Sequence, residues 1–266
     1  MISAEGALWE TGPAGLIKRD ERTGRAEKTL KLGGEPQYVA AGFGAIWVTV
    51  EQSASVASLV RVNAATNEIV ATVDMSPSGV GGNNMLFVAT DKAFVWVFNG
   101  EGTLWRIDPI TNRVNETFHV TDTGSYMTTG GGFVWVSNIS RNEVVRVDPI
   151  TGGTDAVILQ SEPDQLAYIG GAIWVEDVQG NTVTPIDGSL LQPRAPIGTP
   201  NDPAIEIAGL GSLWIAADGV VSRINPLTGR DVQIPITFAA STVAPDDRTG
   251  NVWVLRQPNG WAPPGG

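Results

Sequence analysis

The sequence of 266 residues contains no cysteine and only one histidine, His119. The lack of cysteine excludes disulfides, thiolate metal sites and cysteine nucleophiles, but it does not identify the compartment. No apolar run reaches the roughly 18 residues that a membrane-spanning helix needs. The first residues also lack the basic and apolar segments of a signal peptide. The compartment therefore stays open: a trimmed chain would be secreted, periplasmic or extracellular, and an untrimmed chain would be cytoplasmic.

Basic residues are scarce as well. The chain carries 17 Lys and Arg residues against 28 Asp and Glu residues, which gives a formal net charge of −11. Nucleic acid is a poor partner for such a chain, because binding to phosphates requires a basic surface. A cationic small molecule, protein or peptide fits this charge better.

Tryptophan, by contrast, is abundant, with nine Trp residues against three Tyr residues. Seven of the tryptophans sit in similar phrases, such as GFGAIWVTV (42–50) and GGFVWVSN (131–138). Five of the six intervals between them are 38 to 40 residues long, and the remaining one is 49. A fixed period near 40 residues is typical of repeat architectures. The seven positions are Trp9, Trp47, Trp96, Trp135, Trp174, Trp214 and Trp253.

Each period predicts four β-strands and almost no helix. Apolar residues alternate or form short runs, and turn residues interrupt the chain about every 8–12 positions. The third predicted strand ends in a turn such as DPITN (108–112), DPITG (148–152) or NPLTG (225–229). In such a turn Asp or Asn caps the backbone, Pro presets φ, and Gly or Asn accepts a positive φ. The turn therefore joins two antiparallel strands.

Four strands per repeat, each repeat with its tryptophan, predict an all-β fold: a seven-bladed β-propeller of four-stranded antiparallel blades. Residues 1–266 form a single β-propeller domain in this interpretation. The repeated Trp side chains are expected to be buried between neighbouring sheets. The seventh blade is incomplete, because no third or fourth strand is visible after Trp253. The chain is then either an incomplete propeller or a fragment of a longer protein.

Two phrases carry a family resemblance. WVSN (135–138) resembles the mark of YVTN-repeat propellers, and the composite GAIWV…VVRVDPITG resembles the repeats of streptogramin (virginiamycin B) lyase-like proteins. The resemblance implies a seven-bladed propeller of bacterial type and, for the lyase, an elimination that depends on His and Glu side chains with Mg²⁺. The single histidine, His119, is predicted on the outermost strand of its blade, far from the channel. Lyase chemistry is therefore not expected here.

In a propeller, the loops that lead into each inner strand and the loops that follow each Trp strand surround one mouth of the channel. Two such segments, 51–58 and 75–84, are longer than their counterparts in other repeats. Because function concentrates on loops held by a rigid scaffold, this face is predicted to bind a ligand. The candidate ligand-binding residues are Glu35, Gln37, Glu51, Asn83, Asn84, Asp122, Asn138, Asp164, Asp177, Asp202, Glu206 and Asp218.

These side chains are carboxylates and amides, which attract a cationic ligand and are also the oxygen ligands of Ca²⁺ and Mg²⁺. No compact calcium-loop spacing is present, so no cofactor is expected, and Ca²⁺ or Mg²⁺ stays an alternative. Glu206 stands where other repeats place Val39 or Leu166 on the inner strand. Its carboxylate is expected to face the water of the channel.

A basic residue also recurs on the third predicted strand, two residues before the Asp or Asn of the turn. Both residues then point to the same face of the strand. We expect an Arg–Asp contact that supports the turn and, as an exposed pair, is worth about 0–1 kcal/mol. The repeated residues are Arg61, Arg106, Arg146 and Arg223, with Lys18 at a similar place.

The sequence predicts a non-enzymatic binding or recognition module that uses the loop face at the channel mouth. No Gly-rich phosphate loop, zinc-protease motif or nucleophile elbow is present, so no catalytic residue is assigned. Two alternatives stay open. One is a streptogramin lyase-like or other metal-assisted lyase or hydrolase that uses the rim carboxylates. The other is a sensor or scaffold domain excised from a longer protein.

Overall fold

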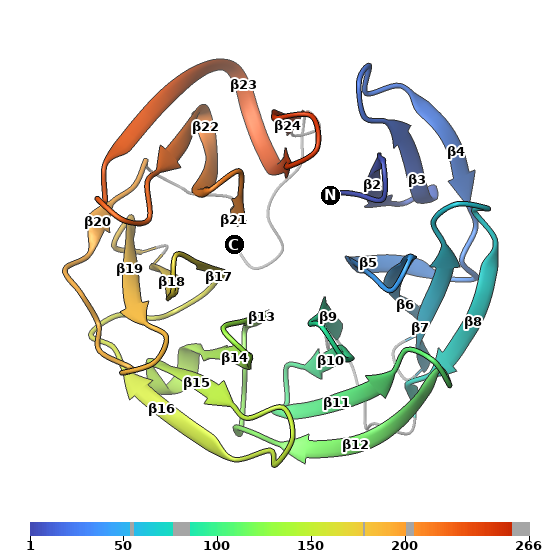
Figure 1. The fold of residues 1–266 in the computed structure, drawn as a ribbon, viewed down its shortest axis with the longest axis horizontal. Helices are drawn as coiled ribbons and strands as arrows, with labels where there is room; N and C mark the ends of the chain where they lie inside the picture. Colours follow the sequence, from blue (N-terminus) through green and yellow to red (C-terminus); the bar gives the residue numbers. More distant parts are fainter. Residues whose placement is uncertain (54–55, 77–85, 178, 201–204, 257–266) are drawn as a thin grey trace.

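The structure is a computed structural model that describes residues 1–53, 56–76, 86–177, 179–200 and 205–256. Its strands form six four-stranded antiparallel sheets arranged around a common axis (Figure 1). In the first five sheets the first strand lies nearest the axis and the fourth lies outermost (Figure 1). Among the described residues, no helix has the length and apolar character needed to cross a bilayer.

The first three sheets follow one another along the chain. The first contains β1 (Ile2–Ala4), β2 (Ala7–Gly12), β3 (Gly15–Asp20) and β4 (Ala26–Leu30). The second contains β5 (Glu35–Gly42), β6 (Ala45–Ser53), β7 (Val56–Asn63) and β8 (Ile69–Asp74). The third contains β9 (Leu86–Thr90), β10 (Val95–Asn99), β11 (Thr103–Asp108) and β12 (Arg113–His119).

The remaining three sheets continue around the ring. The fourth contains β13 (Tyr126–Gly130), β14 (Phe133–Asn138), the short 3-10 helix η2 (Ile139–Arg141), β15 (Glu143–Val147) and β16 (Thr154–Ile158). The fifth contains β17 (Leu166–Ile169), β18 (Ala172–Asp177), β19 (Thr182–Asp187) and β20 (Ile197–Gly198). The sixth contains β21 (Ile205–Gly209), β22 (Ser212–Ile224), β23 (Asp231–Asp246) and β24 (Asn251–Arg256).

The core lies between the sheets and is built around the repeated tryptophans, as the sequence predicts. The first six Trp side chains of the repeat, Trp9 to Trp214, are at most 5% exposed. Trp135, for example, packs with Ile173 and Val175 of the next sheet. Five of these six indole N–H groups donate to the backbone carbonyl five residues earlier. The rings of Trp9, Trp47, Trp135 and Trp174 fill the space between two sheets, and Trp214 packs within the sixth sheet. The polar atom of each of these five rings keeps a partner.

The prediction of seven blades is wrong, because the chain forms six four-stranded sheets. β23 is 16 residues long, and residues 231–235 pair with β22 while residues 240–246 pair with β24, which carries Trp253. The link between these halves, ITF (236–238), contains no Gly, Asp or Asn that would turn the chain, and Ala239 still pairs with Asp218 of β22, so the strand continues. Trp253 therefore lies in a two-stranded extension of the sixth sheet, where it is only partly buried.

This extension comes round to the first sheet (Figure 1). Arg248, on the turn between β23 and β24, forms an ion pair with Glu21, and its Nε lies 3.2 Å from Oε2. Ser3 of β1 forms a hydrogen bond with Asp246 at the end of β23. The first and last parts of the described chain thereby close the ring.

The repeated arginines make a different contact from the predicted one. Asp148 accepts hydrogen bonds from two amides of its own turn, so its carboxylate is already engaged as the turn cap. The guanidinium of Arg106 reaches the next sheet instead, where Nη1 donates to the carbonyl of Pro149 at 2.7 Å. Arg61 makes the same contact with Pro109 at 2.6 Å. Arg61 and Arg106 therefore link neighbouring sheets rather than supporting their own turns, whereas Nε of Arg223 donates to Ser212 of its own sheet at 2.9 Å.

The lengthened segment 51–58 forms mostly strand and not the expected loop. β6 continues to Ser53 and β7 begins at Val56, and these two residues pair with each other. In the second lengthened segment, residues 77–84 lie outside the described residues. The binding role predicted for these two segments stays a prediction.

Candidate functional site

The inner strands β5, β9, β13, β17 and β21 surround the axis of the ring (Figure 1). Glu35, at the start of β5, pairs with Glu51 near the end of β6. The segments that lead into inner strands and those that follow Trp strands therefore share one face of the disc, as the sequence predicts. We term it the mouth face. The opposite face, where the tight turns lie, is termed the turn face.

Three of the predicted ligand-binding side chains on the mouth face are occupied with structural contacts. Gln37 donates through Nε2 to Glu51 Oε2 of the same sheet at 2.6 Å. Its Oε1 accepts from the amide of Leu86 at 3.1 Å, and this hydrogen bond links the second sheet to the third. Asn138 is buried and caps η2 with its side-chain oxygen. Asp177 accepts an amide hydrogen bond from its own loop at 2.9 Å. These contacts account for the presence of the three polar side chains at these positions, and no ligand is needed to explain them.

Other predicted residues form an exposed acidic rim. Glu35 and Asp218 are exposed, and Asp122 is exposed as well. Asp122 forms an ion pair with Arg141, and its Oδ1 lies 3.9 Å from Nε2 of His119. His119 ends β12, the outermost strand of its sheet, where the sequence predicts it. The rim is thus negative, with part of its charge already paired.

Four predicted positions stay predictions. Asn83, Asn84 and Asp202 lie outside the described residues. Glu206 belongs to β21, but its side chain is also outside what the structure describes.

A buried carboxyl group that the sequence analysis missed lies next to Asp164. Glu176 on β18 is 0% exposed, and neither of its carboxyl oxygens has a hydrogen-bond partner among the described residues. Burial raises the pKa of Glu176 to about 8, and the nearby charge of Asp164 adds to this effect. Burial raises the pKa of Asp164 too, and its amide donates to the carbonyl of Glu176 at 2.9 Å. Glu176 is therefore mostly neutral at pH 7.

The repeat register contains the signal that identifies Glu176. It stands two residues after Trp174, at the position that other repeats give to Thr49 and Ser137. These two hydroxyls donate to backbone carbonyls at 2.7 and 2.6 Å, in the segment that begins the next sheet. A carboxylate has no hydrogen to donate, whereas a carboxylic acid has one. A protonated Glu176 is the form that matches this position.

Three aromatic rings meet near the mouth end of the axis. Tyr38 of β5, Phe87 of β9 and Tyr126 of β13 have ring centroids 4.5 to 6.2 Å apart. Tyr38 and Tyr126 belong to the second and fourth sheets, which are not neighbours, so both rings must lie close to the axis. Burial, with a smaller contribution from the charge of Asp164, raises the pKa of Tyr38 to about 12. We term Tyr38, Phe87, Tyr126 and Asp164 the mouth cluster.

Aromatic faces beside a carboxylate are the groups that hold an organic cation. The mouth cluster offers such a site at the centre of an acidic face. Within the described ranges, no group of three or more His, Asp or Glu residues is placed to hold a metal ion.

No protein-family model matches the sequence, and no curated protein matches it either. Among solved structures, the chain is similar to BamB from Moraxella catarrhalis, with a TM-score of 0.64 and 15% sequence identity. The similarity covers 91% of this chain and 77% of the BamB chain. At this low sequence identity, the similarity indicates a shared fold but not a shared activity. Six radial sheets and this likeness together identify the chain as a β-propeller.

Proposed function

We propose that this propeller is a recognition module that binds an organic cation, such as a Lys side chain or another ammonium group, at the mouth cluster. The observation that carries the proposal is the convergence of Tyr38, Tyr126 and Asp164. The three come from the second, fourth and fifth sheets, and the two Tyr ring centroids are 6.2 Å apart. Asp164 is close enough for its charge to raise the pKa of Tyr38.

The energetics of Asp164 support a cationic ligand. Burial alone accounts for the raised pKa of this carboxyl group, and the described residues provide no ion pair for it. A bound cation would offset part of the cost of burying this charge. The faces of the Tyr rings would add a cation–π contribution of about 0.5–2 kcal/mol.

The rim supports the same class of ligand. Glu35 and Asp218 are exposed on this face, and the chain has a net charge of −11. The negative electrostatic potential of these charges raises the local concentration of cations and the rate at which they reach the mouth face. We propose that the cation belongs to a small molecule or to a protein or peptide partner.

The test uses tetramethylammonium and its neutral analogue neopentyl alcohol as probes, each titrated into the full chain and followed by NMR. We expect tetramethylammonium to bind in the millimolar range and to shift the resonances of Tyr38 and Tyr126. Asp164→Asn should weaken this binding at least about fivefold through loss of the charge.

Glu116→Gln is the matched control, because Glu116 is an exposed carboxylate on the outermost strand β12. It should bind tetramethylammonium like the unaltered chain. Equal binding of the two probes, or binding that is unaffected by Asp164→Asn, would show that the mouth cluster does not recognise a cation.

A further inference from the structure

The turn face carries a row of large apolar side chains. In the third, fourth and fifth sheets the turn between the third and fourth strands exposes one aliphatic residue, and in the sixth sheet the turn between β22 and β23 does so. The residues and their exposed fractions are Ile110 (87%), Ile150 (67%), Leu190 (68%) and Leu227 (82%). We term them the aliphatic arc. Single exposed apolar residues are ordinary on protein surfaces, but several on one face mark an interaction site.

The arc is confined to part of the ring. In the first two sheets the corresponding turns carry Arg22 and Ala65, and the turn between β23 and β24 carries Arg248. The turn geometry itself does not require an aliphatic residue there, because all of these turns are capped in the same way by Asp or Asn. The apolar choice on the third to sixth sheets therefore needs another explanation.

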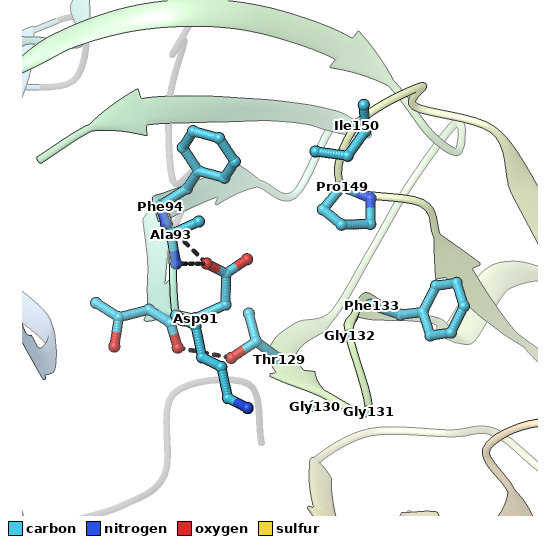
Figure 2. Close-up of a pocket in the computed structure, with 12 residues that line it drawn as sticks. Asp91, Ala93, Phe94, Thr129, Gly130, Gly131, Gly132, Phe133, Pro149 and Ile150 are labelled. Carbon is cyan, nitrogen blue, oxygen red and sulfur yellow. Dashed lines mark hydrogen bonds between the residues drawn. The ribbon is translucent and has the colours of Figure 1, made fainter.

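A hollow lies next to the arc, between the third and fourth sheets. Its volume is about 430 Å³, and its apolar walls include Phe94, Phe133, Pro149 and Ile150. Figure 2 shows Phe94 and Asp91 on one side and Pro149, Ile150 and Phe133 on the other. Gly130, Gly131 and Gly132 also line the hollow, next to Phe133. This volume lies within the range of ligand pockets, about 300–1,000 Å³.

The walls are held in place before any ligand binds. Arg106 stacks over Phe94 with its guanidinium carbon 4.6 Å from the ring centroid, and the same group donates to the carbonyl of Pro149 at 2.7 Å. Arg146 stacks over Phe133 in the same manner at 4.5 Å. Arg106 thus joins the two opposite walls, and Arg146 holds the ring of Phe133 in place. A preformed pocket loses little entropy when it is filled.

Several polar groups in the hollow are already engaged. Oδ1 of Asp91 accepts the amides of Ala93 and Phe94, both at 2.7 Å, and its Oδ2 accepts the indole N–H of Trp96 at 2.7 Å. The hydroxyl of Thr129 donates to a backbone carbonyl of the neighbouring sheet at 2.8 Å. The side chain that fits this hollow is therefore apolar, because few polar groups remain to recognise a sugar or a phosphate.

Negative charge borders the arc. Asp108, Asp148 and Asp187 each stand two or three residues before an arc residue, and each is only partly buried. Hydrogen bonds from the turn amides lower the pKa of all three carboxyl groups, so they are ionised at neutral pH. Lys92, on the rim of the hollow, is the basic residue among its lining. The chain as a whole has a net charge of −11, which disfavours a second copy on this face.

We propose that the turn face is a docking surface for a partner protein that presents an aliphatic or aromatic side chain next to Lys or Arg. The apolar side chain enters the hollow between Phe94 and Ile150, and the rest of the partner covers the aliphatic arc. The basic residue pairs with the carboxylates of Asp108 and Asp148, because Asp187 already forms an ion pair with Arg194 at 3.2 Å. This surface lies on the opposite side of the disc from the mouth cluster and does not depend on the function proposed there.

The test is a selection of phage-displayed peptides of about 12 residues on the immobilised chain, followed by affinity measurement of the enriched peptides. We expect the enriched peptides to share an apolar residue beside Lys or Arg. Ile150→Asp, at the rim, and Ala93→Trp, which places a ring over the hollow, should each weaken their binding at least about tenfold.

Ile158→Asp is the matched control, because Ile158 is a 75% exposed isoleucine of the same sheet on its outermost strand β16, outside the arc. This variant and Asp164→Asn should bind the peptides normally, which separates this surface from the mouth cluster. Peptides without an apolar residue, or no peptide that depends on Ile150, would overturn the proposal. A dimer in sedimentation that Ile150→Asp dissociates would overturn it as well, because the occupant would then be a second copy.

Discussion

The individual side chains of this propeller differ most in whether their polar atoms are satisfied. The indole N–H of Trp135 donates to the carbonyl of Gly130 at 3.0 Å inside the core, so its burial is favourable. Glu176 is just as buried, but its carboxyl oxygens have no partner among the described residues. Burying an unpartnered charge is costly, and the group responds by keeping its proton.

Glu176→Gln should stabilise the protein at pH 8 and have less effect at pH 5. The pKa of Glu176 is raised from 4.5 to about 8 in the folded state. The bound proton therefore makes its full contribution to the free energy of unfolding below a pH of about 4.5, and this contribution is lost as the pH rises through about 8. The slope is at most about 1.4 kcal/mol per pH unit. Gln cannot ionise, so this dependence disappears.

The measurement is the melting temperature of both chains between pH 5 and pH 8.5. Glu116→Gln, on the exposed outer strand, should keep the pH dependence of the unaltered chain. If the Glu176→Gln variant showed the same pH dependence of the melting temperature, the ionisation of Glu176 would not be its cause.

At the scale of strands and turns, the third strands of the second, third and fourth sheets contact the next sheet through Arg61, Arg106 and Arg146. Arg146 stacks on Phe133 of its own sheet and donates through Nη1 to the carbonyls of Gly188 and Ser189 at 3.0 and 3.1 Å. The accepting carbonyls belong to the turn of the fifth sheet. Neighbouring sheets are therefore held together by polar contacts on the turn face as well as by the tryptophan layer.

Arg146→Met should lower the free energy of unfolding by about 1–2 kcal/mol, because it removes the stacked charge, the two hydrogen bonds to the next sheet and the ion pair with Asp155 at 2.7 Å. Urea unfolding followed by tryptophan fluorescence measures this change. Arg146→Lys should recover only part of it, since an ammonium group lacks the planar fork. Arg113→Met, at an exposed position on β12, is the control and should be nearly neutral. If Arg146→Met left the free energy of unfolding unchanged, the buried tryptophans and their apolar neighbours alone would hold the sheets together.

For the whole molecule, stability depends on how the ring closes. The extension made by β24 and the second half of β23 meets the first sheet through the ion pair between Arg248 and Glu21. Glu21 is buried, so its charge depends on this partner. Trp214 packs on Val243 and Val252, so the extension also covers the apolar face of the sixth sheet.

Glu21→Gln should loosen the ring where its ends meet. We expect amide hydrogen exchange to become at least about tenfold faster in β1–β4 and β24, with little change in β13–β16 on the far side of the ring. Glu10→Gln is the matched control, because Glu10 pairs with Arg19 inside the first sheet at 2.6 Å. Uniform acceleration in all sheets would show that the ion pair contributes to global stability and not to closure.

The candidate site was only partly predictable for a physical reason. The sequence predicted Asp164 as a ligand-binding residue, which stays a prediction. It also proposed Gln37, Asn138 and Asp177, which make structural contacts. A polar residue looks the same in sequence whether its partner is a ligand or a neighbouring amide. Tyr38 could not be found in this way, because its neighbours Phe87, Tyr126 and Asp164 lie 49, 88 and 126 residues away in the chain.

The sequence by itself determined the strands, the capped turns, the burial of the repeated tryptophans and the radial arrangement, because alternation, turn chemistry and a fixed period are local properties of the chain. Only the tertiary structure decided that the sheets number six, that the arginines bind the next turn, and that an apolar hollow lies on the face opposite the predicted mouth. Each of these depends on which distant segments come into contact. Those contacts are set by how the ring closes and by how its sheets pack.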